Sequence, residues 1–243
     1  MIEIKNVSTS YVKGQKIIDK MNLKIEDKTI FGFIGPNGAG KTTTLEMITG
    51  VLQIDEGDIL IDGKSIKKDP IEAKKLFGFV PDSPDMFEKL TGIEYLNFIG
   101  DIYKVNPKQR LEIVEKLSRE LNIYNHLKER IQSYSHGMKQ KLLIISVLLY
   151  NPKNWILDEP MTGLDPQASY ILKELMKEHA RKGNTVFFST HVLEVAEKIC
   201  DKIAVINKGK IIYTGSIENL KEQVKNDASL EESFLELIDA KKE

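Results

Sequence analysis

A glycine-rich segment at residues 35–42 constrains this chain more than any other feature, because it fits the pattern G-x-x-x-x-G-K-[ST]. The near-continuous apolar run at residues 29–34 predicts a buried strand directly before it. Residues 41–49 fit a helix that ends at Gly50. A glycine-rich turn between a strand and a helix points successive backbone N–H groups at one place, as phosphate binding requires. The segment therefore predicts an α/β fold with a phosphate-binding loop.

The same loop predicts a nucleotide site that uses Mg²⁺. Lys41 supplies a full positive charge for the β- and γ-phosphates, and the Thr42 hydroxyl is a ligand for Mg²⁺. The helix that begins near Lys41 adds a partial positive charge of about half a unit. The residues expected to contact the nucleotide are Gly35, Pro36, Asn37, Gly38, Ala39, Gly40, Lys41, Thr42 and Thr43. The loop alone does not distinguish ATP from GTP, or an ATPase from a kinase.

Two adjacent carboxylates end a second apolar strand pattern. Residues 155–157 are apolar and lead directly into Asp158 and Glu159. In a parallel sheet the ligand crevice lies beyond the carboxyl ends of the strands, so both side chains are expected to reach the phosphate-binding loop. We interpret Asp158 as a residue that holds Mg²⁺ and Glu159 as the general base that polarises the attacking water.

Strand and helix patterns divide the chain into a core, an insertion and a tail. Strand patterns dominate the first third, and strands alternate with helices after residue 151, which predicts a mostly parallel sheet. Between about residues 84 and 151 only helix patterns occur. We predict an α/β P-loop NTPase core with an N-terminal antiparallel β sub-domain and an inserted helical sub-domain, together residues 1–215. A helical extension at residues 216–243 follows, with a capping-box spacing between Ser229 and Glu232 and an apolar stripe at Leu230, Phe234 and Ile238.

Composition excludes several classes of protein. Lys and Arg number 35 against 36 Asp and Glu, and this net charge of −1 gives no long-range attraction to nucleic acid. No apolar run approaches the ~20 residues that a membrane-spanning helix needs, and the alternating residues 1–5 do not resemble a signal peptide. The single cysteine, Cys200, is interpreted as a small core residue, so a reducing, cytoplasmic setting is the default.

The segment Tyr134-Ser135-His136-Gly137-Met138 narrows the choice among nucleotide-binding proteins. It resembles the Ser-Gly-Gly-Gln-type signature of the ABC ATPase family, in the form found in its drug- and antibiotic-exporter-like branch. Ser135 and Gly137 match that signature, at the start of a helix whose N-terminus is a second anion-binding site. If the helical insertion separates this site from the phosphate-binding loop, two copies arranged head to tail can each lend Ser135 and Gly137 to the other's ATP.

Three further positions fit the same resemblance, and one departs from it. Tyr11 lies where the family places an aromatic ring against adenine. Asp165, in Gly-Leu-Asp, resembles the D-loop that crosses the dimer interface, and His191, after an apolar strand, resembles the switch histidine at the γ-phosphate. The other three histidines are interpreted as surface or sub-domain residues. Where the family commonly has a Gln near Mg²⁺, this chain has Asp82, which we include among the candidate Mg²⁺ ligands with its role left open.

The resemblance implies an ATP-binding and ATP-hydrolysing motor subunit of an ABC membrane transporter, with export favoured over import. It implies a separate transmembrane permease, contacted through residues 83–96, and a second ATP-binding subunit that is identical or different. The chain would then lie on the cytoplasmic face of the membrane, bound to its permease. The alternatives are a non-transport ABC ATPase that acts on nucleic acid or ribosomes, a P-loop protein without hydrolysis, and a GTPase that would use residues 207–210.

Overall fold

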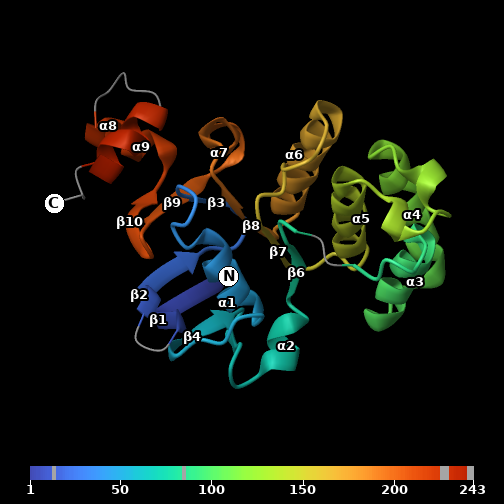
Figure 1. Cartoon of the computed structure of the whole chain (residues 1–243), viewed down its shortest axis with the longest axis horizontal. Helices are drawn as coiled ribbons and strands as arrows, with labels where there is room; N and C mark the ends of the chain where they lie inside the picture. The colour runs from blue at the N-terminus through green and yellow to red at the C-terminus, as the bar shows by residue number, and fades with distance from the viewer. Residues whose placement is uncertain (13–14, 84–85, 225–229, 240–243) are drawn as a thin grey trace.

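The computed structural model describes residues 1–12, 15–83, 86–224 and 230–239. A six-stranded sheet forms the centre of the molecule (Figure 1), in the order β10-β9-β3-β8-β7-β6. Its strands are β3 (Ile30–Ile34), β6 (Phe77–Val80), β7 (Asn154–Leu157), β8 (Thr185–Thr190), β9 (Lys202–Asn207) and β10 (Lys210–Gly215). All neighbouring pairs are parallel except β9 and β10, which confirms the mostly parallel sheet.

A four-stranded antiparallel sheet of order β2-β1-β4-β5 lies beside the first sheet. Its strands are β1 (Ile2–Val12), β2 (Gln15–Ile25), β4 (Glu56–Ile61) and β5 (Lys64–Ser65). The strand patterns indicated only residues 2–7 and 21–25 for the first two strands. Register shifts along β1 and the positive φ angles of Asn6 and Lys20 (50° and 47°) interrupt the alternation of apolar and polar side chains there. Because of these irregularities, the sequence pattern did not indicate the full length of either strand.

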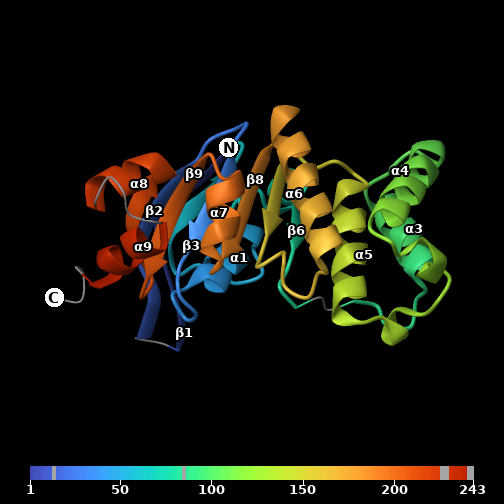
Figure 2. The ribbon, with the colours of Figure 1, turned by 90° about the horizontal axis from the view of Figure 1, so that it is seen from above.

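Helices cover both faces of the central sheet. Successive side chains of β8 point to opposite faces of the sheet. Val186 and Phe188 pack in the apolar cluster that contains α6 (Pro166–Arg181), whereas Phe187 packs in the cluster that contains α1 (Lys41–Thr49). The helix α1 is enclosed between the two sheets, where Leu45 and Ile48 are fully buried. The helix α7 (Leu193–Ile199) lies on the same side as α6 (Figures 1 and 2), and α2 (Pro70–Lys74) precedes β6.

A group of helices stands at one end of the molecule (Figure 2). It contains α3 (Gly92–Ile102), α4 (Pro107–Glu120), α5 (His136–Leu148) and the 3-10 turns η1 (Tyr124–His126) and η2 (Ile131–Ser133). The predicted capping box begins α3, since the Thr91 side chain accepts from the Glu94 N–H and the Glu94 carboxylate accepts from the Thr91 N–H. The antiparallel sheet, the parallel sheet and this helical group together confirm the expected fold class.

The tail forms α8 (Ile217–Val224) and α9 (Leu230–Asp239) at the opposite end of the molecule. Phe234 of the predicted stripe packs with Leu237 against a cluster that includes Ile203 and Leu220. Ser229, the first residue of the second capping box, lies outside the described residues. The tail therefore packs beside β9 and α7, with Leu235 exposed on its outer side.

Two residues of the parallel sheet region pack towards the core, half-buried Cys200 and buried His179. Cys200 packs so closely on β3 that a Cβ atom at Gly32 would lie 2.7 Å from its Sγ, and burial raises the pKa of the thiol. His179 of α6 is only 4% exposed, with its ring edge-on to Trp155. Our interpretation of this histidine as a surface or sub-domain residue is therefore wrong. The charged residues next to it in the sequence of α6 suggested an exposed position, whereas the side chain of His179 faces the core.

Candidate nucleotide site

The loop between β3 and α1 passes close to other backbone segments. A Cβ atom at Gly35 would lie 2.4 Å from the Ile206 carbonyl oxygen, so only glycine lets the loop pass β9. Gly38 and Gly40 adopt positive φ angles of 78° and 105°, which turn the chain into the helix. The free N–H groups at the start of α1 therefore face the region beyond the carboxyl ends of the strands.

Lys41 bridges the loop and the second acid of the predicted pair. Its Nζ donates to the carbonyl oxygens of Gly35 at 2.8 Å and Pro36 at 3.3 Å, and lies 3.3 Å from Glu159 Oε1. The side chain of Lys41 is 6% exposed and that of Glu159 is 13% exposed. The phosphate-binding loop and Glu159 are therefore in direct contact, although they are distant in the sequence.

Asp158 lies in the most buried part of the site, directly after β7. Its N–H donates to the Val80 carbonyl at 2.8 Å, and its carboxylate accepts a hydrogen bond from the Ser189 hydroxyl. Burial raises the pKa of Asp158 although Ser189 and Thr42 act to lower it, and the charges of Asp82 and Glu159 act in the same direction as burial. A cation at this position would offset all three negative charges.

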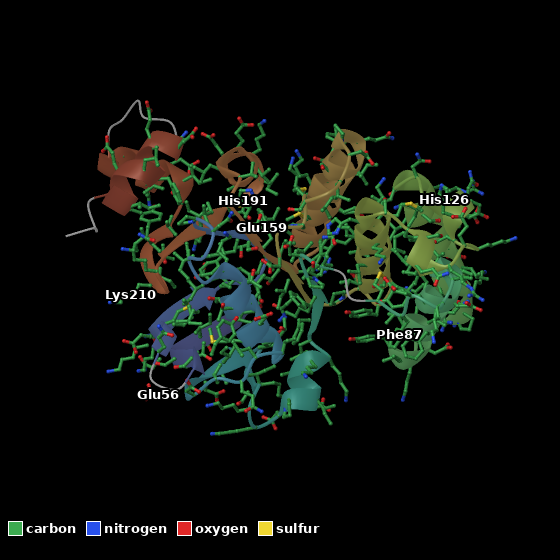
Figure 3. All side chains as sticks on the ribbon, viewed as in Figure 1. Glu56, Phe87, His126, Glu159, His191 and Lys210 are labelled. Carbon is green, nitrogen blue, oxygen red and sulfur yellow. The ribbon has the colours of Figure 1, made fainter. Side chains whose placement is uncertain are left out.

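Glu159 contacts the predicted switch histidine. His191 Nδ1 lies 2.9 Å from Glu159 Oε2, and Figure 3 shows the two side chains together at the centre of the molecule. The backbone of Glu159 has a φ angle of 43°, in the left-handed region that non-glycine residues rarely adopt. Its carboxylate therefore lies between Lys41 on one side and His191 on the other.

One cavity adjoins Lys41 and Glu159. It is lined by Tyr11, Ile17, Asn37, Gly38, Gly40, Lys41, Thr42, Thr43, Asp82 and Glu159. Tyr11 is 59% exposed, and its hydroxyl lies 3.1 Å from Thr43 Oγ1 and 3.3 Å from Glu46 Oε2, which leaves the ring free to stack. Sequence reasoning missed Ile17, because β2 was expected to begin at residue 21. It also missed Ser189, which carried no signal beyond its place before Thr190 and His191.

Three predicted residues, Ser135, Gly137 and Asp165, form a second group away from this cavity. Ser135 caps α5 by accepting from the Met138 N–H at 3.3 Å, and a Cβ atom at Gly137 would lie 2.4 Å from the Gly163 carbonyl oxygen. Asp165 caps α6 and lies 2.6 Å from Lys141 Nζ. The structure therefore brings the signature residues together with the predicted D-loop of the same chain, and none of them lines the cavity that Lys41 and Glu159 share.

The oxygen donors at the cavity and next to it fit a shared Mg²⁺ ion. Thr42 and Asp82 line the cavity and Asp158 is buried beside them, and their hydroxyl and carboxylate oxygens are donor types that Mg²⁺ prefers. In the part of the chain that the structure describes, no group of three or more His, Cys, Asp and Glu side chains is placed to hold a metal ion. Mg²⁺ commonly combines one or two protein carboxylates with phosphate oxygens and water.

Comparisons with known proteins give the same picture. Residues 18–162 match the family model described as ABC transporter. The chain is 37% identical to the uncharacterized ABC transporter ATP-binding protein YhcH of Bacillus subtilis (strain 168), over 92% of this chain and 71% of the relative. It is 31% identical to the linearmycin resistance ATP-binding protein LnrL of the same organism, over 95% and 74% of the two chains.

A solved structure, described as the ATP binding subunit of an ABC transporter, superposes with a TM-score of 0.93. It is 31% identical in sequence, and the match covers 98% of this chain and 99% of that one. Within the described ranges, we find no helix with both the length and the apolar character to cross a membrane. The family model, the relatives and the superposed structure agree with the geometry of the cavity. The chain therefore belongs to the ABC transporter family, as an ATP-binding subunit with ATPase activity.

Proposed function

We propose that this chain is the motor of an exporter, in which two ATP-binding subunits close head to tail around two molecules of Mg-ATP. The observation that carries the proposal is the separation of two anion-binding groups. Lys41 and the phosphate-binding loop line one cavity, whereas Ser135 and Gly137 lie at the N-terminus of α5, outside it. A second cassette is needed to bring both groups onto one ATP.

The residues at the cavity have separate tasks in this proposal. Tyr11 stacks on adenine, the backbone N–H groups of the phosphate-binding loop other than Pro36 and the Lys41 ammonium hold the phosphates, and Thr42, Asp158 and Asp82 would hold Mg²⁺. When bound, Mg²⁺ neutralises charge on the β- and γ-phosphates. Glu159 accepts a proton from the attacking water, and His191, whose Nδ1 lies 2.9 Å from Glu159 Oε2, orients that carboxylate towards the γ-phosphate.

The second subunit would complete each site from the opposite side. Ser135 and the N–H groups that begin α5 offer hydrogen bonds and the positive end of the helix dipole to a γ-phosphate. Asp165 and Gly163 lie against this helix in the same chain and would cross the interface next to it. ATP joins the two subunits and hydrolysis releases them. The partner is a second copy of this chain or a different cassette.

The permease is proposed to dock beside α3. Of the residues expected to contact it, Met86 is buried and Leu90 packs partly against the core, whereas Phe87 is 59% exposed. The Phe87 ring makes an edge contact with exposed Phe98, with ring centroids 5.5 Å apart. Figure 3 shows Phe87 at the lower side of the helical group. Docking of the permease against these two rings would hold the chain at the cytoplasmic face of the membrane.

A groove next to these rings extends the proposed docking surface. It runs between α1 and α2 on one side and α3 and α5 on the other. Its lining includes Val51, Lys74, Ile99 and Tyr103. Val51 is 68% exposed, and Tyr103 is stacked on Tyr150 with ring centroids 3.6 Å apart. An apolar cytoplasmic helix of the permease is the ligand that such a lining suits.

The proposed division of the chain follows the packing. Residues 1–215 would form the ATPase domain, with the helical sub-domain inserted at about residues 84–151, and residues 216–243 the extension. The described helices of the insertion share one cluster with α6 and β7, whereas the antiparallel sheet and α1 share another. The insertion would therefore pack against the α6 side of the ATPase core.

The direction of transport is proposed from resemblance. The relative LnrL is named for linearmycin resistance, and the Tyr-Ser-His-Gly-Met form and the helical tail also favour export. Action on nucleic acid is the alternative, and the formal net charge of −1 provides no electrostatic attraction to phosphate backbones.

Light scattering with Mg-ATP tests the dimer mechanism. Glu159→Gln keeps every phosphate ligand and removes the base, so we expect a stable dimer that forms only with ATP. Lys41→Ala, which loses the phosphate cation, should stay monomeric, and both variants should lose hydrolysis. A Glu159→Gln chain that binds Mg-ATP and remains monomeric would contradict closure of two copies of this chain.

A further inference from the structure

A single buried hydroxyl links the two acids of the site. Ser189 Oγ accepts a hydrogen bond from the Glu159 N–H at 3.0 Å and donates one to Asp158 Oδ1. Ser189 has no exposed surface, and Asp158 is 1% exposed. Bulk water therefore does not compete for either hydrogen bond, and the hydroxyl acts both as a donor and as an acceptor.

The position of Ser189 follows from the strand register. Leu157 pairs with Phe188 between the parallel strands β7 and β8, so Ser189 comes level with the residue that follows Leu157. At Glu159 the chain leaves the sheet with a φ angle of 43°. The Glu159 N–H then bonds the Ser189 side chain, and this hydrogen bond supports a backbone conformation that costs free energy in a non-glycine residue.

The same strand end also reaches the Glu159 side chain. His191, two residues after Ser189, contacts Glu159 Oε2 through Nδ1 at 2.9 Å. The segment from Ser189 to His191 thus holds Glu159 at its backbone and at its carboxylate, and holds Asp158 at its carboxylate. A displacement of this strand end would move both acids together.

A second buried hydroxyl on β8 lies away from the two acids of the site. Thr185, at the other end of the strand, is also fully buried, and its Oγ1 donates to Asp27 Oδ1 at 3.3 Å. Thr185 makes that bond far from the cavity and contacts neither acid of the site. The pair Thr185–Asp27 therefore provides a matched structural control for Ser189–Asp158.

We propose that Ser189 is a positioning residue for hydrolysis, whose hydroxyl fixes the Asp158 carboxylate relative to the backbone of Glu159. This inference rests on the proposed roles of Asp158 and Glu159. Because Ser189 has no exposed surface and its hydroxyl bonds Asp158 and the Glu159 N–H, it would act through the two acids. Its loss should impair hydrolysis and Mg²⁺ use while leaving the contacts to adenine and phosphate intact.

The test compares Ser189→Ala, Ser189→Thr and the control Thr185→Val in the full chain. For Ser189→Ala we expect kcat to fall about tenfold or more, because hydrogen bonds to both acids are lost. The KM for ATP should change less than about twofold, and the Mg²⁺ concentration for half-maximal rate should rise. Binding of a fluorescent ATP analogue in EDTA should equal that of the native chain. Ser189→Thr keeps the hydroxyl and should recover much of kcat, while Thr185→Val should hydrolyse ATP normally.

Two results would overturn the proposal: a native kcat in Ser189→Ala, or an equal loss of kcat in Ser189→Ala and Thr185→Val. If Ser189→Ala does not fold, Ser189→Cys, with similar volume and a weak donor, takes its place with the same expectations. Lys41→Ala and Glu159→Gln separate this proposal from the proposed function. If those two variants still hydrolyse ATP, the assignment of the site fails. If they are inactive while Ser189→Ala is normal, only the role of Ser189 fails.

Discussion

Lys41 Nζ lies 3.3 Å from Glu159 Oε1, so the cation proposed to bind phosphate is paired with the carboxylate proposed to activate water. Both side chains are largely buried, which strengthens their attraction relative to an ion pair in water. A phosphate that enters the loop must compete with Glu159 for the Lys41 ammonium. The proposed general base and the nucleotide would therefore be coupled before any chemistry takes place.

We predict that Glu159→Gln binds ATP more tightly than the native chain in EDTA, by about threefold or more, because the ammonium no longer has an anionic partner. Titration with a fluorescent ATP analogue measures this change. The matched control is Glu72→Gln, which removes an exposed carboxylate paired with Lys75 at 2.6 Å and should leave ATP affinity unchanged. Equal affinities of Glu159→Gln and the native chain would show that the pair does not compete with phosphate.

Tyr11 provides a test of adenine stacking. Its ring is exposed at the mouth of the cavity, while its hydroxyl contacts Thr43 and Glu46. We predict that Tyr11→Ala weakens ATP binding about tenfold, since a base stacked on an aromatic ring contributes about 1–3 kcal/mol. Tyr11→Phe keeps the ring and should bind nearly normally. Calorimetric titration distinguishes the two, and equal losses in both variants would assign the contribution to the hydroxyl.

Asp82 provides a test of the departure from the family pattern. It lines the cavity with Thr42 and Glu159, and its charge helps to raise the pKa of Asp158. We predict that Asp82→Asn raises the Mg²⁺ concentration for half-maximal hydrolysis by about threefold or more, because an anionic oxygen is lost. ATP binding in EDTA should not weaken, since a negative charge beside the phosphates has been removed. An unchanged Mg²⁺ requirement would exclude Asp82 from the metal site.

From the burial of His179 we predict that the stability of the fold depends on pH. Burial, with Lys182 nearby, lowers the pKa of His179 from 6.5 to about 4. Between about pH 6.5 and pH 4 the unfolded chain binds a proton at this residue and the folded chain does not, so stability falls as the pH falls through that window. The loss approaches about 3 kcal/mol at the acidic end.

Urea denaturation of the native chain and of His179→Phe between pH 7 and pH 4.5 measures this dependence. The native chain should lose more stability than His179→Phe over that range, because the variant lacks the titrating group. His126→Gln, at an exposed histidine, should follow the native chain. Parallel curves for native and His179→Phe would show that His179 does not titrate differently on unfolding.

Local patterns were sufficient to locate the phosphate-binding loop, the acid pair and the start of α3. Each depends on residues close together in the chain, such as the strand, glycines and helix around Lys41 or the capping box at Thr91. The cavity lining also includes Tyr11 and Asp82, which the family resemblance indicated. Short-range spacing and a known family pattern therefore predicted most of the candidate site.

Long-range register determined what the sequence did not reveal. The contact between Ser189 and Asp158 depends on how β8 aligns with β7, and no local pattern encodes that alignment. The burial of His179 likewise depends on which face of α6 packs against Trp155. The left-handed backbone of Glu159 is visible only once both neighbouring segments are placed.

The close packing of Cys200 against Gly32 has a practical consequence for spectroscopy. Its thiol is the single cysteine of the chain, and its burial and raised pKa suppress the thiolate that alkylating labels require. A cysteine introduced at an exposed position would react selectively with a spin label or dye without prior removal of Cys200. One label per subunit would then report distances between two subunits, and slow reaction of Cys200 itself would record opening between β3 and β9.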